Sequence, residues 1–191
     1  MTDLEPMPAD NPLVKIGAAL VALIIAGLTV VMLCAVLHLA NLSHDISQAT
    51  DETGYQLTGY GKIVYYIRDV VTLALGLVMV FLMARTVVPL GTGSSSSRTR
   101  ALILAGLTTL MCIGFDAAWG PNMTVSTAIA DSNEFTSRIE ALQTGDMPST
   151  LAAALKVGAF GVPILALCLG ITLLAPPTTR YFQAMRRAGR Y

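Results

Sequence analysis

Apolar residues in this chain gather in four long runs that shorter polar stretches separate. Within the first run, Ile16 to Leu37 contains no charged residue. Its length matches the roughly 20 apolar residues with which a helix crosses about 30 Å of hydrocarbon. The pattern predicts an all-α, polytopic membrane protein, a four-helix transmembrane bundle whose membrane domain covers 13–177. The predicted spans are about 13–41, 63–89, 101–119 and 151–175.

Four spans place both ends of the chain on one side of the membrane, and cytoplasmic flanks retain Lys and Arg during insertion. The loops 42–62 and 120–150 contain Lys62 and Arg138 as their only basic residues, together with seven acidic residues. We therefore expect these loops outside the plasma (inner) membrane, and the segment 1–12 and the basic tail 178–191 in the cytoplasm. The basic residues of the cytoplasmic flanks are Lys15, Arg85, Arg98, Arg100, Arg180, Arg186, Arg187 and Arg190.

The second outer loop is predicted to form an amphipathic helix from about Thr124 to Thr144, with Gly145 as its stop. Its polar face is acidic and lacks Lys, which argues against an anionic lipid surface and favours a protein partner. The apolar stripe follows a spacing of three and four residues. The expected partner-contact residues are Val125, Ile129, Phe135, Ile139 and Leu142.

The first helix is predicted to continue outward beyond its span, because Leu42, Ile46 and Ala49 extend a helical stripe as far as Gly54. Other patterns indicate helix contacts within the membrane. Small residues at four-residue spacing let helices approach closely, within one subunit or between partners. The small-residue stripes are Ala18/Ala22/Ala26, Ala154/Gly158 and Ala166/Gly170.

Charged residues also occur within the predicted spans. Asp69 lies 16 residues before Arg85, about 24 Å of helix, so the second span draws Asp69 and its neighbour Arg68 below the outer surface. We expect an intramembrane charge cluster at this depth, because charges in hydrocarbon usually face the bundle interior and pair. It either locks the register of the helices or lines a cavity for an ion, a proton or an anionic ligand. The cluster comprises Arg68, Asp69, Asp116, Lys156 and His38.

Two polar stretches are expected on the cytoplasmic side. The Gly- and Ser-rich segment from Gly91 to Arg100 lacks the Gly-Lys-Ser/Thr of a phosphate loop and is predicted to be a flexible connection. The Arg-rich tail is expected along the anionic inner leaflet or on a cytoplasmic partner.

Composition excludes several classes of function. Hydrophobic residues make up 54% of the chain, charged residues only 13%, and the net charge of zero gives no reason to expect nucleic acid. The two histidines, His38 and His44, lie in one region, so two helices of one chain cannot both ligate a haem through histidine. The three cysteines form no C-x-x-C pair. We expect no enzyme activity, no cofactor and no metal site.

Two hypotheses about function remain. The first is an accessory or structural subunit that contacts other membrane protein subunits, in the bilayer and through its outer loops. The second is a small homo-oligomeric channel or transporter that uses the charge cluster. A membrane sensor that signals through the Arg-rich tail has weaker support.

Overall fold

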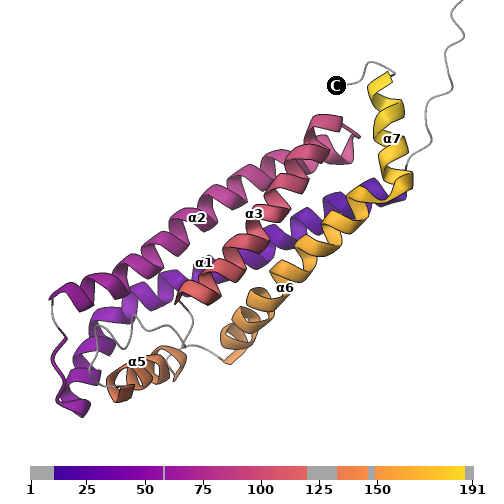
Figure 1. Cartoon of the computed structure of the whole chain (residues 1–191). Helices are drawn as coiled ribbons and strands as arrows, with labels where there is room; N and C mark the ends of the chain where they lie inside the picture. The colour runs from indigo at the N-terminus through magenta and orange to yellow at the C-terminus, as the bar shows by residue number, and fades with distance from the viewer. Residues whose placement is uncertain (1–10, 58, 120–132, 146–148, 188–191) are drawn as a thin grey trace, which may run out of the picture. The chain divides into compact units, whose positions relative to one another are not determined.

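The computed structural model describes residues 11–57, 59–119, 133–145 and 149–187 of the 191-residue chain (Figure 1). This part of the chain is all-α and contains six helices. Long helices occupy all four of the predicted spans. The helices are α1 (Pro12–Thr53), α2 (Gly59–Gly91), α3 (Ser95–Trp119), α5 (Asn133–Gly145), α6 (Ser149–Leu174) and α7 (Pro176–Arg187).

Two helices of the described chain are long and apolar enough to cross a membrane: α1 over its full length and α2 over Gly61–Gly91. A third candidate joins Phe160–Leu174 of α6 to α7, if two helices that bend by 60° form one span. The outer surface of these helices is apolar. On α6, Leu167 and Ile171 are 62% and 65% exposed, although both are large aliphatic side chains. Such surfaces suit lipid and indicate a multi-pass membrane protein.

The first helix continues beyond its predicted span, as expected. It ends at Thr53, and Gly54 follows with a φ of 71°. The Gly54 amide donates a 2.8 Å hydrogen bond to the carbonyl of Thr50. A left-handed glycine that satisfies a carbonyl of the last turn is a common helix stop.

The expected flexible connection from Gly91 to Arg100 is wrong for most of its length. Helix α2 includes Gly91, and α3 already begins at Ser95. The amide of Ser94 donates to the carbonyl of Pro89, and the Ser94 carbonyl accepts from Arg98. Serine is favoured where a helix begins, so the same residues that resemble a linker in composition start a helix here.

The chain packs as two units. The first comprises Met1–Ala26, Met79–Leu110 and Val162–Tyr191. The second comprises Gly27–Val78 and Met111–Gly161. Helices α1, α2, α3 and α6 each contribute residues to both units, α7 belongs to the first, and α5 belongs to the second.

In the first unit, the buried residues of α2 and α6 follow helical spacing. Met79, Met83, Thr86 and Leu90 line one side of α2, while Phe81 and Val88 point outward. On α6 the buried side consists of Val162, Ala166, Leu169 and Leu173. Helix α1 approaches this layer closely at Gly17, where a β-carbon would lie 3.1 Å from a methyl carbon of Leu173. Glycine therefore sets the distance between α1 and α6 in this unit.

Two consecutive prolines end α6 and begin α7 in the first unit. Pro176 and Pro177 carry no amide hydrogen, so the carbonyls of Thr172 and Leu173, four residues earlier, lose their helical donors. Two side chains replace them. The hydroxyl of Thr178 donates to the Thr172 carbonyl at 2.9 Å, and Nε of Arg98 donates to the Leu173 carbonyl at 3.0 Å. Both backbone carbonyls at the break therefore accept hydrogen bonds from side chains of the same chain.

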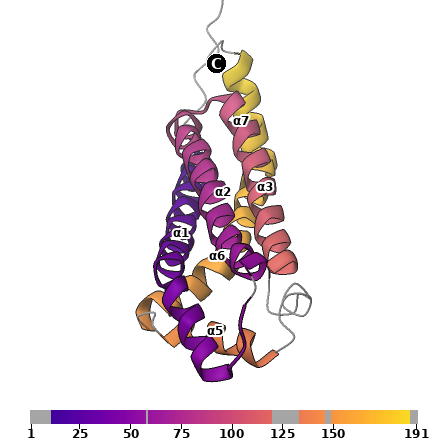
Figure 2. The ribbon, with the colours of Figure 1, turned by 90° about the vertical axis from the view of Figure 1, so that its left-hand side faces the viewer.

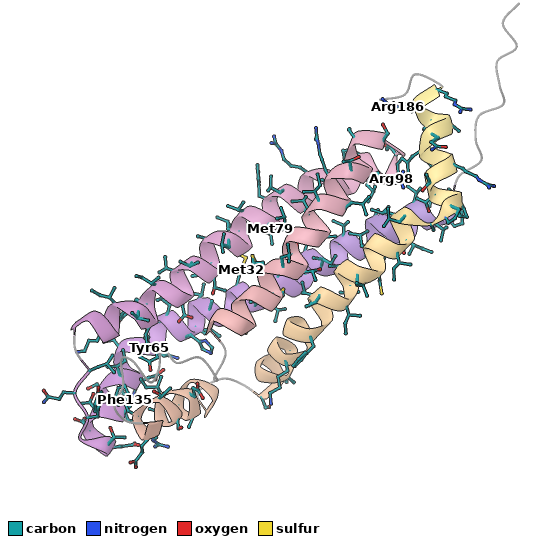
Figure 3. The ribbon with its side chains drawn as sticks, viewed as in Figure 1. Met32, Tyr65, Met79, Arg98, Phe135 and Arg186 are labelled. Atoms are coloured by element: carbon teal, nitrogen blue, oxygen red, sulfur yellow. The ribbon has the colours of Figure 1, made fainter. Side chains whose placement is uncertain are left out.

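Helix α7 packs its apolar side against the rest of the first unit. Phe182 and Met185 are buried, and Arg98 lies beside α7 (Figure 3). The turn between α2 and α3 also contacts α7 at Gly93, which has a φ of 84°. A β-carbon on Gly93 would lie 2.9 Å from the ring of Tyr181 and 3.2 Å from Met185. Both the backbone conformation and the space at this position therefore require glycine.

In the second unit, α5 packs beside the last turns of α1 (Figures 1 and 2). Elsewhere in this unit, glycines bring α1 close to its neighbours. A β-carbon on Gly76 of α2 would lie 2.7 Å from Cγ of Met32, and one on Gly158 of α6 would lie 3.5 Å from the Gly27 carbonyl oxygen. The expected Ala154/Gly158 contact with another helix is thus made within the chain at Gly158.

Replacement of Gly93 by alanine should weaken the contact of α7 with the α2–α3 turn. The left-handed conformation costs a non-glycine residue roughly 1–2 kcal/mol, and the new methyl group displaces Tyr181. We expect Gly93→Ala to lower the melting temperature of the detergent-purified protein. The matched control is Gly106→Ala on α3, where a β-carbon meets nothing within 4 Å. Equal melting temperatures for the two variants would contradict the contact.

Candidate functional site

The five residues of the predicted intramembrane charge cluster all belong to the second unit. Asp69 is buried on α2 and only 4% exposed. His38 on α1 is half-buried, whereas Lys156 on α6 is exposed. Arg68 and Asp116 lie on α2 and α3, but their side chains are outside the described set. The cluster therefore stays a prediction. Of its members, Asp69 is buried and Lys156 is exposed.

The burial of Asp69 contrasts with its neighbours on the same turn of α2. Ile67 and Val70 are about half exposed, at 47% and 50%. The helix thus turns a carboxyl group inward and aliphatic side chains outward, the reverse of a helix at a water-facing surface. Ionisable groups within spans usually face the interior, because a charge in hydrocarbon costs about 2.5–3.5 kcal/mol on insertion scales.

The predicted partner-contact helix is present as α5, and its described apolar stripe packs on the same chain. Phe135 and Ile139 are 0% and 1% exposed. The ring of Phe135 contacts that of Tyr55 with centroids 5.3 Å apart. Val125 and Ile129 lie outside the described residues. We name this assembly of α1, α5 and the segment between α1 and α2 the cap; its apolar core consists of Leu42, Ile46, Ala49, Leu57, Phe135 and Ile139, with Tyr55, Tyr65 and Leu142 at the edge.

This packing changes which surface of α5 a partner could use. The side of α5 that carries Phe135 and Ile139 is covered by α1. On the rest of α5, the exposed residues include Glu134, Glu140 and Ala141. A protein that contacts α5 would therefore meet mainly polar and acidic side chains. Periodicity alone could not reveal this, because an apolar stripe has the same spacing whichever chain covers it.

An ion pair at the surface of the cap joins α5 to the end of α1. Nε and one terminal nitrogen of Arg138 donate to the two carboxylate oxygens of Glu52, the latter bond at 3.0 Å. Gln48 donates to the same carboxylate at 2.9 Å. The hydrogen bond from Arg138, then that from Gln48, lowers the pKa of Glu52 to about 2. The same pair raises the pKa of Arg138. This ion pair could not be predicted from the sequence, because residues 52 and 138 are far apart in the chain.

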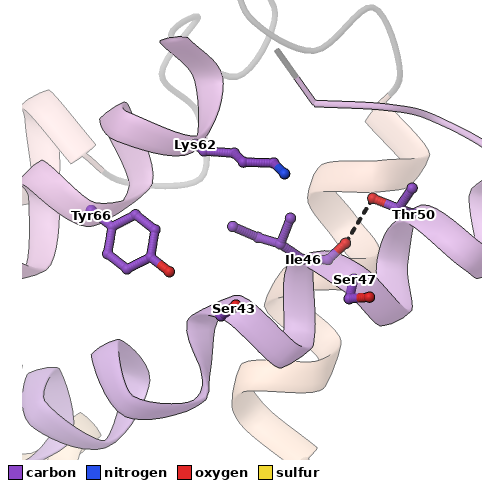
Figure 4. Close-up of a pocket in the computed structure, with 6 residues that line it drawn as sticks. All are labelled: Ser43, Ile46, Ser47, Thr50, Lys62 and Tyr66. Carbon is purple, nitrogen blue, oxygen red and sulfur yellow. Dashed lines mark hydrogen bonds between the residues drawn. The ribbon is translucent and has the colours of Figure 1, made fainter. Parts of the chain in front are cut away.

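A polar pocket of about 320 Å³ opens between α1 and α2 in the second unit (Figure 4). Lys62 and Tyr66 of α2 point toward the hydroxyl-bearing side of α1. The Thr50 hydroxyl donates to the Ile46 carbonyl at 2.8 Å and so keeps its lone pairs free to accept. An ammonium group and several hydroxyls can hold a small polar or anionic molecule. The pocket is lined by Ser43, Ile46, Ser47, Thr50, Lys62 and Tyr66.

A second polar arrangement surrounds Arg98 in the first unit. Besides the Leu173 carbonyl, the guanidinium group binds the Thr179 hydroxyl at 2.7 Å. It also lies over the ring of Phe182, 5.5 Å from the centroid. Arginine can fill all three roles at once because its planar group combines several donors with an aromatic stacking face. From the sequence, Arg98 is expected only as a cytoplasmic charge. The features that could have indicated a packed α7 are the helix-ending Pro176-Pro177 and the helical spacing of Thr178, Phe182 and Met185.

In the described part of the chain, no group of three or more His, Cys, Asp or Glu residues could hold a metal ion. Comparison of the chain with protein-family models, curated proteins and solved structures found no match. Any account of function therefore depends on the chemistry of the chain itself.

Titration of Glu52 tests the cap. Because its folded pKa is about 2 and its ordinary value 4.5, the ion pair stabilises the docked α5 fully above about pH 4.5 and is lost as the pH falls toward 2. We expect NMR of the carboxyl carbon to give a midpoint near pH 2, and the variant Arg138→Gln to raise it toward 4.5. A midpoint near 4.5 in the unaltered protein would refute the pairing.

Proposed function

We propose that the protein is a non-catalytic integral subunit of a larger membrane protein complex. It crosses the inner (plasma) membrane four times as a helical bundle, with both ends in the cytoplasm and α5 on the outer side. It contacts its partners through helix surfaces in the bilayer and through the outer cap. The observation that carries the proposal is a row of exposed alanines on α1, which lies among exposed large side chains such as Leu23.

The two kinds of outward apolar face support different contacts. On α6, large side chains such as Ile164, Leu167 and Ile171 point outward, as expected for a surface that meets flexible lipid chains. On α1, Ala19, Ala22 and Ala26 are exposed about one turn apart, in a row beside the exposed Leu23. Small side chains suit close approach of another helix, because in lipid helix association is driven by packing. The predicted stripe at Ala22 and Ala26 is thus available to a partner, while Ala18 is half-buried within the first unit.

The distribution of charge supports the proposed orientation. In the first unit, every described charged residue is basic: Lys15, Arg85, Arg98, Arg100, Arg180, Arg186 and Arg187. The second unit contains the described acids Asp45, Asp51, Glu52, Asp69, Glu134 and Glu140. Since cytoplasmic flanks retain Lys and Arg, the first unit would contain the cytoplasmic ends of the spans.

The interior of the first unit supports a structural role over conduction by a single subunit. Thr86 and Thr108 are buried polar residues inside its helices. Their hydroxyls donate to Met83 and Leu104 of their own helices, at 2.7 and 2.8 Å. Hydroxyls bonded in this way satisfy the backbone and line no polar path. A channel or transporter remains the second candidate, because Asp69 is buried in α2.

Photocrosslinking in intact membranes tests the proposal. A crosslinking amino acid at Ala22 or Ala26 should give a discrete product with a different membrane protein, because the α1 face lies against it. The matched control is the same amino acid at Leu167, on the lipid-facing side of α6, which should give no such product.

Two results would reject the subunit role. One is that Ala22 and Ala26 give no protein product beyond that of Leu167. The other is that the product is a dimer of this chain and that the purified protein conducts ions in liposomes, with the flux abolished by Asp69→Asn. The latter result would assign the second candidate function.

A further inference from the structure

We propose that the exposed surface of α7 is a binding site for the headgroups of anionic phospholipids. The inference requires the membrane location of the proposed function, but no partner subunit. Helix α7 separates its apolar and its basic residues onto two sides. Thr178, Phe182 and Met185 form the buried side. Arg180 and Arg187, seven residues apart, lie on the opposite, exposed side, and Arg186 is exposed beside them.

The apolar side of α7 is already occupied by the chain itself. Phe182 lies beneath the Arg98 guanidinium, and Tyr181 and Met185 surround Gly93. Amphipathic helices that enter a membrane surface insert this side into lipid. Helix α7 cannot do so without leaving its packed position. The surface that it offers is therefore cationic, and held in place by the protein core.

Contacts of α7 bring further cations to the same end of the first unit. The Asn11 amide, just before α1, donates to the Pro177 carbonyl at 3.3 Å, and Arg98 binds Thr179 from the start of α3. Lys15 follows Asn11 by four residues and Arg100 follows Arg98 by two, and both are exposed. Arg98 itself is used inside the junction. Every charged side chain in the described part of the first unit is basic.

Position and chemistry favour lipid phosphate as the occupant. The axis of α7 bends by 60° from that of Phe160–Leu174, so an α6 that crosses the membrane directs α7 toward the headgroup plane. Guanidinium groups bind phosphate oxygens through two parallel hydrogen bonds. Basic residues at the inner surface attract anionic lipid by an amount that corresponds to about fivefold in affinity per residue.

The test measures lipid binding by the full-length protein in a neutral detergent. Phosphatidylglycerol and phosphatidylcholine are titrated separately and counted by native mass spectrometry. We expect tighter binding of phosphatidylglycerol, weakened by salt. The double variant Arg180→Gln/Arg187→Gln should lose roughly 25-fold in phosphatidylglycerol affinity and leave phosphatidylcholine unchanged. The control Gln183→Ala changes an exposed, uncharged side chain of α7 and should alter the affinity for neither lipid.

Two outcomes of the lipid titration would overturn the site. They are equal affinity of the unaltered protein for the two lipids, and an unchanged phosphatidylglycerol affinity in the double variant. Preferential binding of a polyglutamate peptide would assign the surface to an acidic protein instead. Because this assay contains no partner protein, it can fail while the α1 crosslinks succeed, and the reverse.

Discussion

The helices of this chain carry more apolar surface than the chain can bury, and this excess constrains the rest of the structure. Only 28% of the apolar window of α1 and 22% of that of α2 is buried within the chain. The remainder requires a non-aqueous surrounding, and hydrocarbon offers no hydrogen bonds to the backbone. Continuous helices satisfy this condition, and threonine hydroxyls within them bond to carbonyls of the same helix.

The same constraint gives the proline break between α6 and α7 its importance. Where Pro176 and Pro177 remove two backbone donors, the carbonyls of Thr172 and Leu173 need other hydrogen-bond partners. Thr178 supplies one locally, and Arg98 supplies the other from α3. Arg98, near the start of α3, donates to the Leu173 carbonyl at the end of α6. It also donates to Thr179 and lies over the ring of Phe182, both on α7, so one side chain joins three helices. A residue counted first as a marker of orientation is thus a structural centre of the first unit.

Hydropathy was enough to predict the all-α class and the positions of the long helices, because runs of about 20 apolar residues leave few alternatives. It also predicted the outward extension of α1, since Gly54 ends an unbroken stripe. It could not predict α7 as a packed helix, because the burial of Phe182 depends on Arg98, far away in the chain. From its Ser-rich composition, Ser95–Arg100 is expected to be a flexible linker, but its serines begin α3.

The direction in which the candidate side chains point could not be predicted from the sequence. Spacing along the chain predicts a common depth in the bilayer for Asp69 and Lys156, but it does not predict which way each side chain points. In the structure Asp69 is buried and Lys156 is exposed. For the same reason, the sequence identifies Phe135 and Ile139 as part of a contact stripe but does not say which segment packs against them. That segment is α1, which leaves the small-residue face of α1 as the stronger candidate for a partner.

The central claim is that the chain crosses the membrane repeatedly, with the basic residues of the first unit on the cytoplasmic side. Single cysteines in a variant without Cys34, Cys112 and Cys168 test it directly, at Ala141 on α5 and at Ser96 at the start of α3; both positions are exposed. A membrane-impermeant maleimide should label Ala141→Cys in intact cells and Ser96→Cys only after the membrane is permeabilised. Labelling of both positions from outside, or of Ser96→Cys alone, would contradict the account.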